Sequence, residues 1–309
     1  MLIVFGLFIL STVISIFASS FTVLLITRVI PAFFQPVYMS AAILTVGTLV
    51  SKDQVPKAVS KLFMGLTAGM IVGIPISSYI SNTLSVDMAM AFFTVINIIS
   101  FLAILFFVPS MPVTLKISYG KQLRVLKKPI LWISVVTVTL ILSGIYSVFS
   151  FFTEYLSKVT HMSNDSISIM LLLFGVTGIG GNYLAGKWLS SNSAKTALLF
   201  PLALGVVYVL IYFMSDLTIP IIILILVWGA LFSIGLNISQ HWISSSILEA
   251  PDISSGLNLS FSNLGITVGS TVGGVFISQI GISSVTWSGV IFMFLAFLII
   301  VLRITVYRR

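Results

Sequence analysis

The sequence predicts an all-α polytopic membrane protein with ten transmembrane helices, and three observations support this fold class. Apolar residues make up 58% of the chain, whose mean hydropathy is +1.20. Charged residues make up only 7%, whereas a soluble globular protein has about 25%. The apolar residues also fall in runs close to the ~20 residues that a helix needs to cross a bilayer. A soluble fold could not cover its surface with so few charges, so we expect lipid around the chain.

Ten apolar runs define the expected spans, and short polar segments separate them. The runs cover residues 2–20, 22–49, 60–81, 88–109, 130–153, 166–189, 195–214, 217–240, 254–280 and 283–304. They predict a partial N-terminal bundle of four helices over 1–109, a basic cytoplasmic linker over 110–129 and a six-helix bundle over 130–309. The chain has no cysteine, and its two histidines lie far apart, so we expect no disulfide, metal site or cofactor.

The basic residues are distributed according to the expected topology. If the N-terminus is cytoplasmic, most of them fall in or beside inside loops: Lys52, Lys57, Lys61, Lys116, Lys121, Arg124, Lys127, Lys128, Lys187, Lys195, Arg303, Arg308 and Arg309. Lys158 lies outside, and Arg28 lies within a span. This asymmetry predicts that both termini are cytoplasmic, and it accounts for the net charge of +8 without a nucleic-acid partner. The stretch 116–128 either orients the chain or binds anionic lipid.

The stretch GLTAGMIVGIPISSYI carries Gly65, Gly69 and Gly73 at four-residue spacing, followed by Pro75. In water, each glycine would cost a helix roughly 1 kcal/mol and an interior proline roughly 3 kcal/mol. In lipid, small residues at this spacing allow two helix backbones to approach closely. The stretch therefore predicts either a static packing groove or a groove between helices that move, and the segment alone does not separate the two.

A second stripe of glycines repeats this spacing 200 residues later, at Gly265, Gly269 and Gly273. Internal repeats of several helices are typical of secondary transporters. The offset makes the spans 60–81 and 254–280 equivalent. The spans 130–153 and 166–189 would then have partners before residue 1. The sequence thus predicts four helices of a first six-helix repeat followed by a complete second repeat, with two helices missing at the front.

Four segments, in this order and spacing, resemble the major facilitator superfamily, in particular its bacterial drug–proton antiporter and sugar-efflux branch. They are TRVIPAFFQPVY, GLTAGMIVGIPIS, GIGGNYLAGKW and NLSFSNLGITVGSTVGG. The resemblance covers essentially the whole chain as helices three to twelve of twelve. Ala32 stands where many members of the family have glycine, and Ser77 stands where a small residue or glycine is usual. The acidic-basic-glycine signature between helices two and three is absent. The resemblance implies a major facilitator fold that is truncated at its N-terminus.

Polar residues inside the apolar spans are the candidate site residues, because an ionisable group at membrane depth is costly. Arg28 is the one charge clearly within a span. It either snorkels to the outer interface or lies in a cavity, where it would pair with a substrate anion or relay a proton. The resemblance to helix four favours the cavity. Gln35 is seven residues further on, on nearly the same helical face. It could bind a ligand, or satisfy backbone groups freed near Pro31 and Pro36.

The second bundle supplies further candidates for a substrate or proton pathway. Glu154 ends the span 130–153, as either an interfacial carboxylate or a proton site, and Tyr146 precedes it in an aromatic stretch that could line an apolar site or face lipid. Asn237 and Gln240 lie near the inner end of one span. Asn258 and Asn263 lie in another, where they contact ligand or join helices. No Asp or Glu lies deep in any of the ten spans, so proton coupling is implied by the resemblance alone.

These observations predict a secondary active transporter, not an enzyme, that exports a small organic solute such as a drug or sugar by alternating access. The resemblance implies a proton gradient as the driving force, an antiport mechanism with a role in multidrug resistance, and a monomer in the bacterial inner membrane. The alternative is a truncated remnant or membrane scaffold of the same family that does not transport. A membrane enzyme would need a catalytic constellation, and a channel would need a filter; the sequence offers neither.

Overall fold

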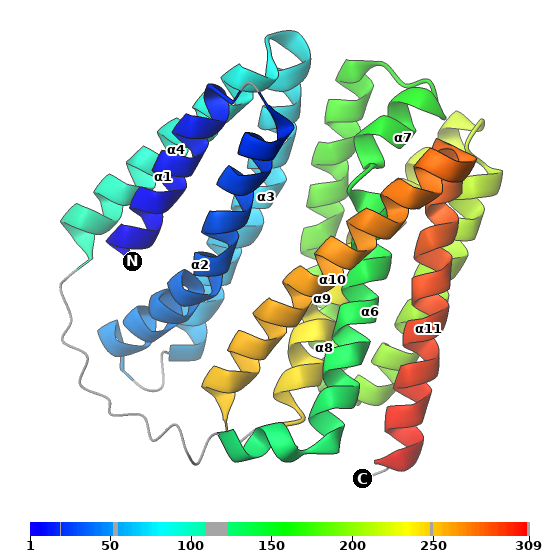
Figure 1. Ribbon diagram of the computed structural model, residues 1–309. Coiled ribbons are helices and arrows are strands. Elements are labelled where there is room, and N and C mark those ends of the chain that lie inside the picture. The colour runs from blue at the N-terminus through cyan, green and yellow to red at the C-terminus, as the bar shows by residue number, and fades with distance from the viewer. Residues whose placement is uncertain (19, 52–54, 109–122, 248–249, 308–309) are drawn as a thin grey trace. The chain divides into compact units, whose positions relative to one another are not determined.

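In the computed structural model, every segment of regular secondary structure that is described is helical. The structure describes residues 1–18, 20–51, 55–108, 123–247 and 250–307. The chain divides into two compact units, Met1–Ile117 and Ser118–Arg309, and each is considered by itself (Figure 1). Most of the predicted linker 110–129 lies outside the described residues.

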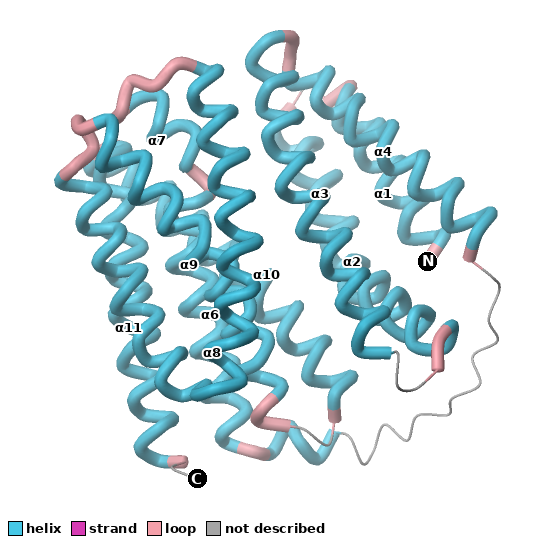
Figure 2. The backbone as a smooth tube through the Cα atoms, turned by 180° about the vertical axis from the view of Figure 1, so that it is seen from behind, coloured by secondary structure: helices cyan, strands magenta, loops and turns pink. Residues whose placement is uncertain are grey.

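Among its described residues, the first unit contains four helices. These are α1 (Leu2–Ile16), α2 (Phe21–Leu49), α3 (Val55–Thr83) and α4 (Val86–Phe107). Within this unit, α1 packs against α4 and α2, and α3 packs against α2 and α4, as the backbone trace shows (Figure 2). Serine caps start two of these helices: the hydroxyl of Ser20 accepts from the amide of Val23 at 3.3 Å, and that of Ser85 from Met88 at 3.1 Å. Such caps satisfy amides that the first helical turn leaves unpaired.

Among its described residues, the second unit contains five longer helices and three short ones. In chain order they are η1 (Leu123–Lys127), α6 (Pro129–Phe149), α7 (Phe152–Lys158), α8 (Asn164–Phe213), α9 (Thr218–Ser244), α10 (Pro251–Ile280), η2 (Ile282–Ser284) and α11 (Val285–Val306). Helix α6 lies centrally in this unit, since it contacts α9, α10 and α11. An aromatic cluster of Phe149, Phe152, Phe174, Trp228 and Phe232 packs α6 and α7 against α8 and α9.

Helix α8 contains two of the expected spans, 166–189 and 195–214, as two arms of one 50-residue element. The break falls at Asn192, whose φ of −155° and ψ of 90° are not helical. The side-chain oxygen of Asn192 accepts a hydrogen bond from the amide of Lys195 at 2.9 Å. Asn192 is therefore the N-cap of the second arm, and the chain reverses direction at this residue without a separate loop.

Several boundaries differ from those expected from the apolar runs; α3, for example, begins at Val55 rather than at residue 60, and α9 ends at Ser244 rather than at residue 240. Helix α1 ends at Ile16 rather than at residue 20, because Phe17 leaves helical geometry. The run 130–153 is broken near Ser150 and Phe151, so Glu154 lies on the separate short helix α7 rather than at the end of a continuous span. Among the described residues, six helices are long and apolar enough to cross a membrane, with α8 counted once. The number of ten spans stays a prediction.

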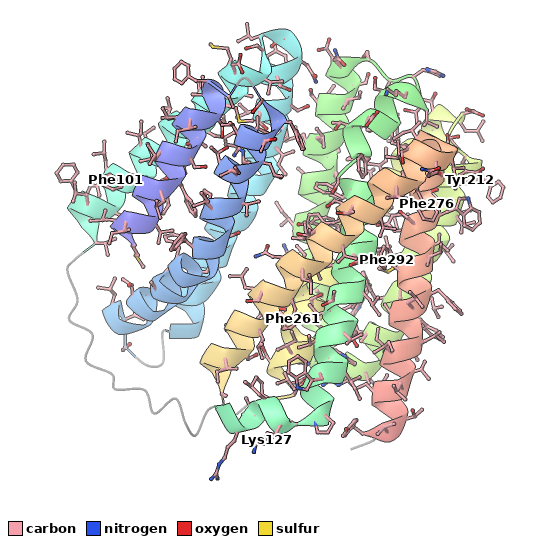
Figure 3. All side chains as sticks on the ribbon, in the orientation of Figure 1. Phe101, Lys127, Tyr212, Phe261, Phe276 and Phe292 are labelled. Atoms are coloured by element: carbon pink, nitrogen blue, oxygen red, sulfur yellow. The ribbon has the colours of Figure 1, made fainter. Side chains whose placement is uncertain are left out.

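Large apolar side chains cover the outer faces of the helices, as expected for a protein in lipid. Phe107 is 84% exposed, and Phe106, Phe213 and Ile219 are at least 70% exposed. In water, so many exposed apolar side chains would promote aggregation. Figure 3 shows side chains projecting outward along the helices of both units, whereas Lys127 projects from the end of the second unit at which α6 begins.

The second glycine stripe brings the backbones of α10 and α6 together. A Cβ atom on Gly265 would lie 2.6 Å from the carbonyl oxygen of Thr139, and one on Gly269 would lie 2.7 Å from the Cα of Ser143. The hydroxyl of Ser143 donates to the carbonyl oxygen of Gly265 at 3.0 Å. Only glycine leaves room for such close approach and for a hydrogen bond between the helices.

The first glycine stripe has different surroundings. Among the described atoms, none lies within 4 Å of a Cβ built on Gly65, Gly69 or Gly73. Pro75 is nevertheless accommodated inside α3, which continues to Thr83. Close packing at the first stripe therefore stays a prediction.

Candidate functional site

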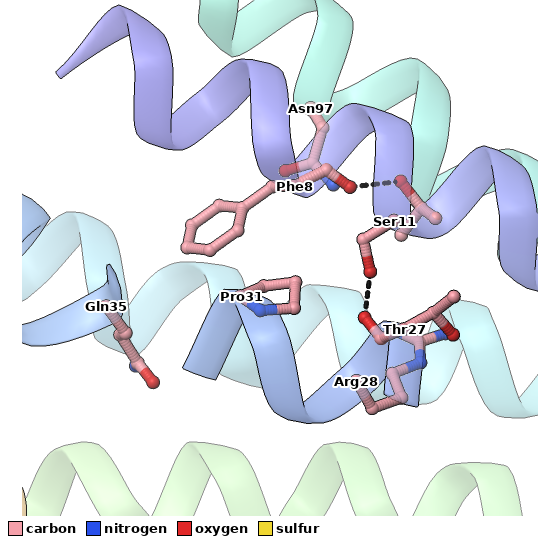
Figure 4. Close-up of a pocket in the computed structure, with 8 residues that line it drawn as sticks. Phe8, Ser11, Thr27, Arg28, Pro31, Gln35 and Asn97 are labelled. Carbon is pink, nitrogen blue, oxygen red and sulfur yellow. Dashed lines mark hydrogen bonds between the residues drawn. The ribbon is translucent and has the colours of Figure 1, made fainter. Parts of the chain in front are cut away.

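A cavity of about 260 Å³, lined by both polar and apolar side chains, lies within the first unit, between α1, α2 and α4 (Figure 4). Its lining comprises Phe8, Ser11, Thr12, Thr27, Arg28, Pro31, Gln35 and Asn97. Two of these, Arg28 and Gln35, are the candidates that the sequence singled out in this segment. The cavity places both on one wall and adds hydroxyl and amide groups from the other helices.

Helix α2 supplies the charged wall of this cavity. Arg28 and Gln35 are seven residues apart, which places them two turns apart on one face of the helix. Pro31 lies between them on the same lining, and its ring presents no N–H group to the cavity. Helix α2 thus places the cation of Arg28 and the amide of Gln35 on either side of the apolar ring of Pro31.

The charge of Arg28 is not neutralised within the described part of the chain. Its guanidinium donates to the sulfur of Met90, and no carboxylate forms an ion pair with it among the described residues. A thioether is a weak acceptor. Arg28 can therefore offer several N–H donors to an anionic or hydroxyl-bearing solute in the cavity.

Helix α1 supplies hydroxyl groups and is joined to α2 through them. The hydroxyl of Ser11 donates to the carbonyl oxygen of Thr27, and the hydroxyls of Ser15 and Thr27 lie 2.9 Å apart. These three side chains are buried. The contacts fix the distance between the two helices and hence the width of the cavity.

Two amide side chains in the cavity have no hydrogen-bond partner among the described residues: Gln35 from α2 and Asn97 from α4. Each amide can donate two hydrogen bonds and accept two. Together with Arg28 they form a set of donors and acceptors suited to a polar, neutral or anionic solute. The residue types do not by themselves distinguish a sugar from another polar molecule.

A second polar group lies in the second unit, along one face of α9. The amide of Asn237 donates to the side-chain oxygen of Asn182 on α8 at 2.6 Å. One turn further on, the side-chain oxygen of Gln240 accepts from the amide of Asn258 on α10 at 2.5 Å. The other side-chain atom of Asn258, Oδ1, is buried without a partner among the described atoms. This face of α9 therefore joins α8 to α10 and retains one buried acceptor.

The remaining sequence candidates lie apart from this polar face. Tyr146 packs against Phe149 and Phe232, at 5.8 and 5.7 Å between ring centroids, so it belongs to the aromatic cluster. The carboxylate of Glu154 pairs with Lys158 at 2.7 Å, and its side chain is 40% exposed. The side chain of Asn263 has no hydrogen-bond partner among the described residues. The exposure of Glu154 and its ion pair with Lys158 support an interfacial role rather than a place in a buried pathway.

Sequence reasoning did not select Asn97, Asn182 or the hydroxyl residues of α1. Asn97 and Asn182 are single amides inside otherwise apolar runs, which is a usable signal, because an amide in lipid needs a partner. The hydroxyls of Ser11 and Ser15 gave no such signal, since serine can satisfy itself by donating to its own helix. Ser15 does so, bonding the carbonyl oxygen of Ser11 at 2.8 Å.

Comparisons with known proteins agree with this architecture. The family model of the Major Facilitator Superfamily matches residues 1–254. The chain is 27% identical to the inner membrane transport protein YdhP of Escherichia coli K12, over 96% of this chain and 76% of the relative. It is 29% identical to the uncharacterized MFS-type transporter YtbD of Bacillus subtilis, over 88% and 70%. It is 25% identical to a probable sugar efflux transporter of Helicobacter pylori, over 94% and 74%. The chain belongs to the Major Facilitator Superfamily.

Proposed function

We propose that the protein is a secondary transporter that exports a small polar organic solute across a bacterial inner membrane, driven by a proton gradient. The observation that carries this proposal is the cavity around Arg28, whose lining combines hydroxyl groups, a cation without a carboxylate partner among the described residues, and two amides without a hydrogen-bond partner among them. Transporters of this kind bind solute near the bilayer midplane and expose it alternately to the two sides. The alternative of a non-transporting remnant is not favoured by the similarities above.

A sugar is the solute class that we propose first. The cavity offers N–H, hydroxyl and carbonyl groups on several sides, as a polyhydroxylated molecule requires. Several relatives from Helicobacter are described as probable sugar efflux transporters. A cavity of about 260 Å³ is somewhat smaller than the roughly 300–1,000 Å³ of most ligand pockets, which favours a small sugar over a large drug.

The coupling proton has no obvious carrier among the described residues. Of the acidic residues whose backbone is described, Asp87, Glu154, Asp165 and Asp252 lie in the first turns of α4, α7, α8 and α10, and Asp216 lies between α8 and α9. A helix end does not reach the middle of the bilayer. We therefore propose proton coupling on the family relationship alone.

Counterflow in proteoliposomes tests the proposed function. Vesicles containing the full chain and loaded with an unlabelled sugar are expected to accumulate the same radiolabelled sugar transiently, for at least one sugar of a panel of pentoses and hexoses. A protonophore should abolish gradient-driven efflux but leave counterflow intact, because exchange needs no gradient. Empty vesicles are the control. If every sugar gives the signal of empty vesicles, the sugar proposal fails, and a drug panel then tests transport itself.

Asn97→Ala is expected to reduce counterflow of the active sugar on the order of fivefold, because a solute hydroxyl loses a hydrogen-bonding partner worth about 1 kcal/mol. Ser100→Ala, one turn further along α4, is the matched control, since the hydroxyl of Ser100 bonds its own helix at Ile96. Equal activity of the two variants would show that Asn97 does not contact the solute.

A further inference from the structure

A second cavity, of about 480 Å³, lies in the second unit between the two arms of α8 and α9. Its lining comprises Trp188, Ser191, Asn192, Lys195, Thr196, Leu199, Phe200, Ala203, Leu231 and Ile234. None of these residues belongs to the cavity around Arg28 or to the polar face of α9. The cavity therefore needs an explanation of its own.

The lining changes from polar to apolar along its length. Asn192, Lys195 and Thr196 lie at the break of α8, whereas Ala203 lies eight residues further along the second arm. At 1.5 Å per residue, this places Ala203 about 12 Å deeper. Leu199 is 49% exposed and Trp188 is 45% exposed, and Leu202 beside them is also exposed. The groove thus opens among exposed apolar side chains of this unit, as the binding of an acyl chain would require.

The break in α8 lies at the basic end of the second unit. Helix α6 starts at this end, just after Lys127 and Lys128, and the first arm of α8 returns to it (Figure 1). Arg303 lies near the same end on α11. Its guanidinium already donates to the carbonyl oxygen of Trp242 and to the hydroxyl of Ser245, both at 3.0 Å, and lies 4.0 Å from the centre of the Trp242 ring. Arg303 is therefore engaged within the protein.

Lys195, by contrast, is exposed at the mouth of the groove and forms no ion pair within the described residues. It lies in the first turn of the second arm of α8, so the positive end of that helix dipole adds to its charge. Trp188 lines the same groove, and tryptophan is enriched where a protein meets the headgroups of a membrane. The mouth of the groove is thus positive and interfacial, and its depth is apolar.

We propose that this groove binds an anionic phospholipid of the surrounding membrane. The phosphate lies beside Lys195 and the start of the second arm of α8, and one acyl chain lies between that arm and α9, along Leu199, Ala203 and Ile234. Basic pockets between transmembrane helices bind anionic headgroups in this way. A neutral lipid would fill the apolar part but leave the cation unpaired. The proposal does not depend on the function proposed above.

Native mass spectrometry of the full chain, released from detergent with added phosphatidylglycerol or phosphatidylcholine of the same acyl chains, tests the proposal. We expect one phosphatidylglycerol to remain bound preferentially. Lys195→Gln should reduce that bound fraction on the order of fivefold, because a lysine near an anionic surface contributes about 1 kcal/mol. Ala203→Phe should also reduce it, since the larger side chain fills the place of the acyl chain.

Two variants serve as matched controls. Lys127→Gln removes an exposed charge from the same end outside the groove, and Leu202→Phe enlarges an exposed side chain next to it; both should retain the lipid. Glycerol phosphate, which has no acyl chains, should not displace it. Equal retention of the two lipids, or an equal effect of Lys195→Gln and Lys127→Gln, would overturn the proposal. Displacement by glycerol phosphate would show a phosphate site without lipid, which also contradicts it.

Discussion

Replacing Gly269 with alanine is expected to destabilise the second unit, because the added methyl group would overlap the backbone of α6. A Cβ at this position would lie 2.7 Å from the Cα and 2.9 Å from the carbonyl carbon of Ser143. Backbone atoms cannot avoid the methyl group by a change of rotamer, as a flexible side chain can. Helices α10 and α6 must therefore move apart. Overpacking of this kind costs roughly 1–3 kcal/mol. We expect the unfolding temperature in detergent to fall on the order of 5 °C.

Gly256→Ala is the matched control, because Gly256 lies on the same helix and no described atom is within 4 Å of its Cβ position. There the substitution should be neutral or stabilise the helix by up to about 1 kcal/mol. Thermal unfolding followed by size-exclusion chromatography compares the two variants. Equal unfolding temperatures for Gly269→Ala and Gly256→Ala would contradict the close contact between α10 and α6.

Arg28→Gln is expected to lower solute counterflow at least tenfold while leaving the unfolding temperature nearly unchanged. The guanidinium lies in the lining of the first cavity with only a weak acceptor, the sulfur of Met90, as a partner. Its removal therefore costs the fold little but removes a charged donor from the solute. Hydrogen bonds to charged groups contribute about 1.5–3 kcal/mol, which corresponds to the expected loss.

Arg28→Lys and Arg124→Gln complete this experiment. Lysine keeps the charge but not the planar fork of donors, so counterflow should be intermediate. Arg124 is exposed on η1, and its replacement should leave counterflow at the wild-type level. If Arg28→Gln transports as well as Arg124→Gln does, Arg28 is an interfacial anchor and not a binding residue.

Hydropathy predicted the helices well because each apolar run must satisfy its own backbone in lipid. The run 88–109 corresponds to α4, Val86–Phe107, and the run 254–280 to α10, Pro251–Ile280. One error arises where the chain turns within an apolar run. The apolar run that continues past Phe149 hides the break before α7, since Phe151 and Phe152 are as apolar as the helix before them.

The candidate site was predicted less completely, because the arrangement of helices determines which polar groups meet. Helical periodicity was enough to place Arg28 and Gln35 on one face. It could not show that Asn97, some 60 residues away, lies in the same cavity, nor that Asn237 bonds Asn182 while Gln240 bonds Asn258. The ion pair of Glu154, by contrast, depends only on local sequence, because its partner Lys158 lies four residues away, at the spacing of a helical ion pair.

Thiol labelling tests most directly the central claim that the cavity around Arg28 binds the transported solute. The chain contains no cysteine, so Gln35→Cys introduces a single reactive thiol into the cavity lining, and Thr83→Cys introduces one at the exposed end of α3. The account predicts that the sugar with the highest counterflow slows alkylation of the Gln35→Cys variant by N-ethylmaleimide several-fold and leaves the Thr83→Cys variant unchanged. Alkylation of the Gln35→Cys variant at the same rate with and without that sugar, in vesicles that still transport it, would contradict the account.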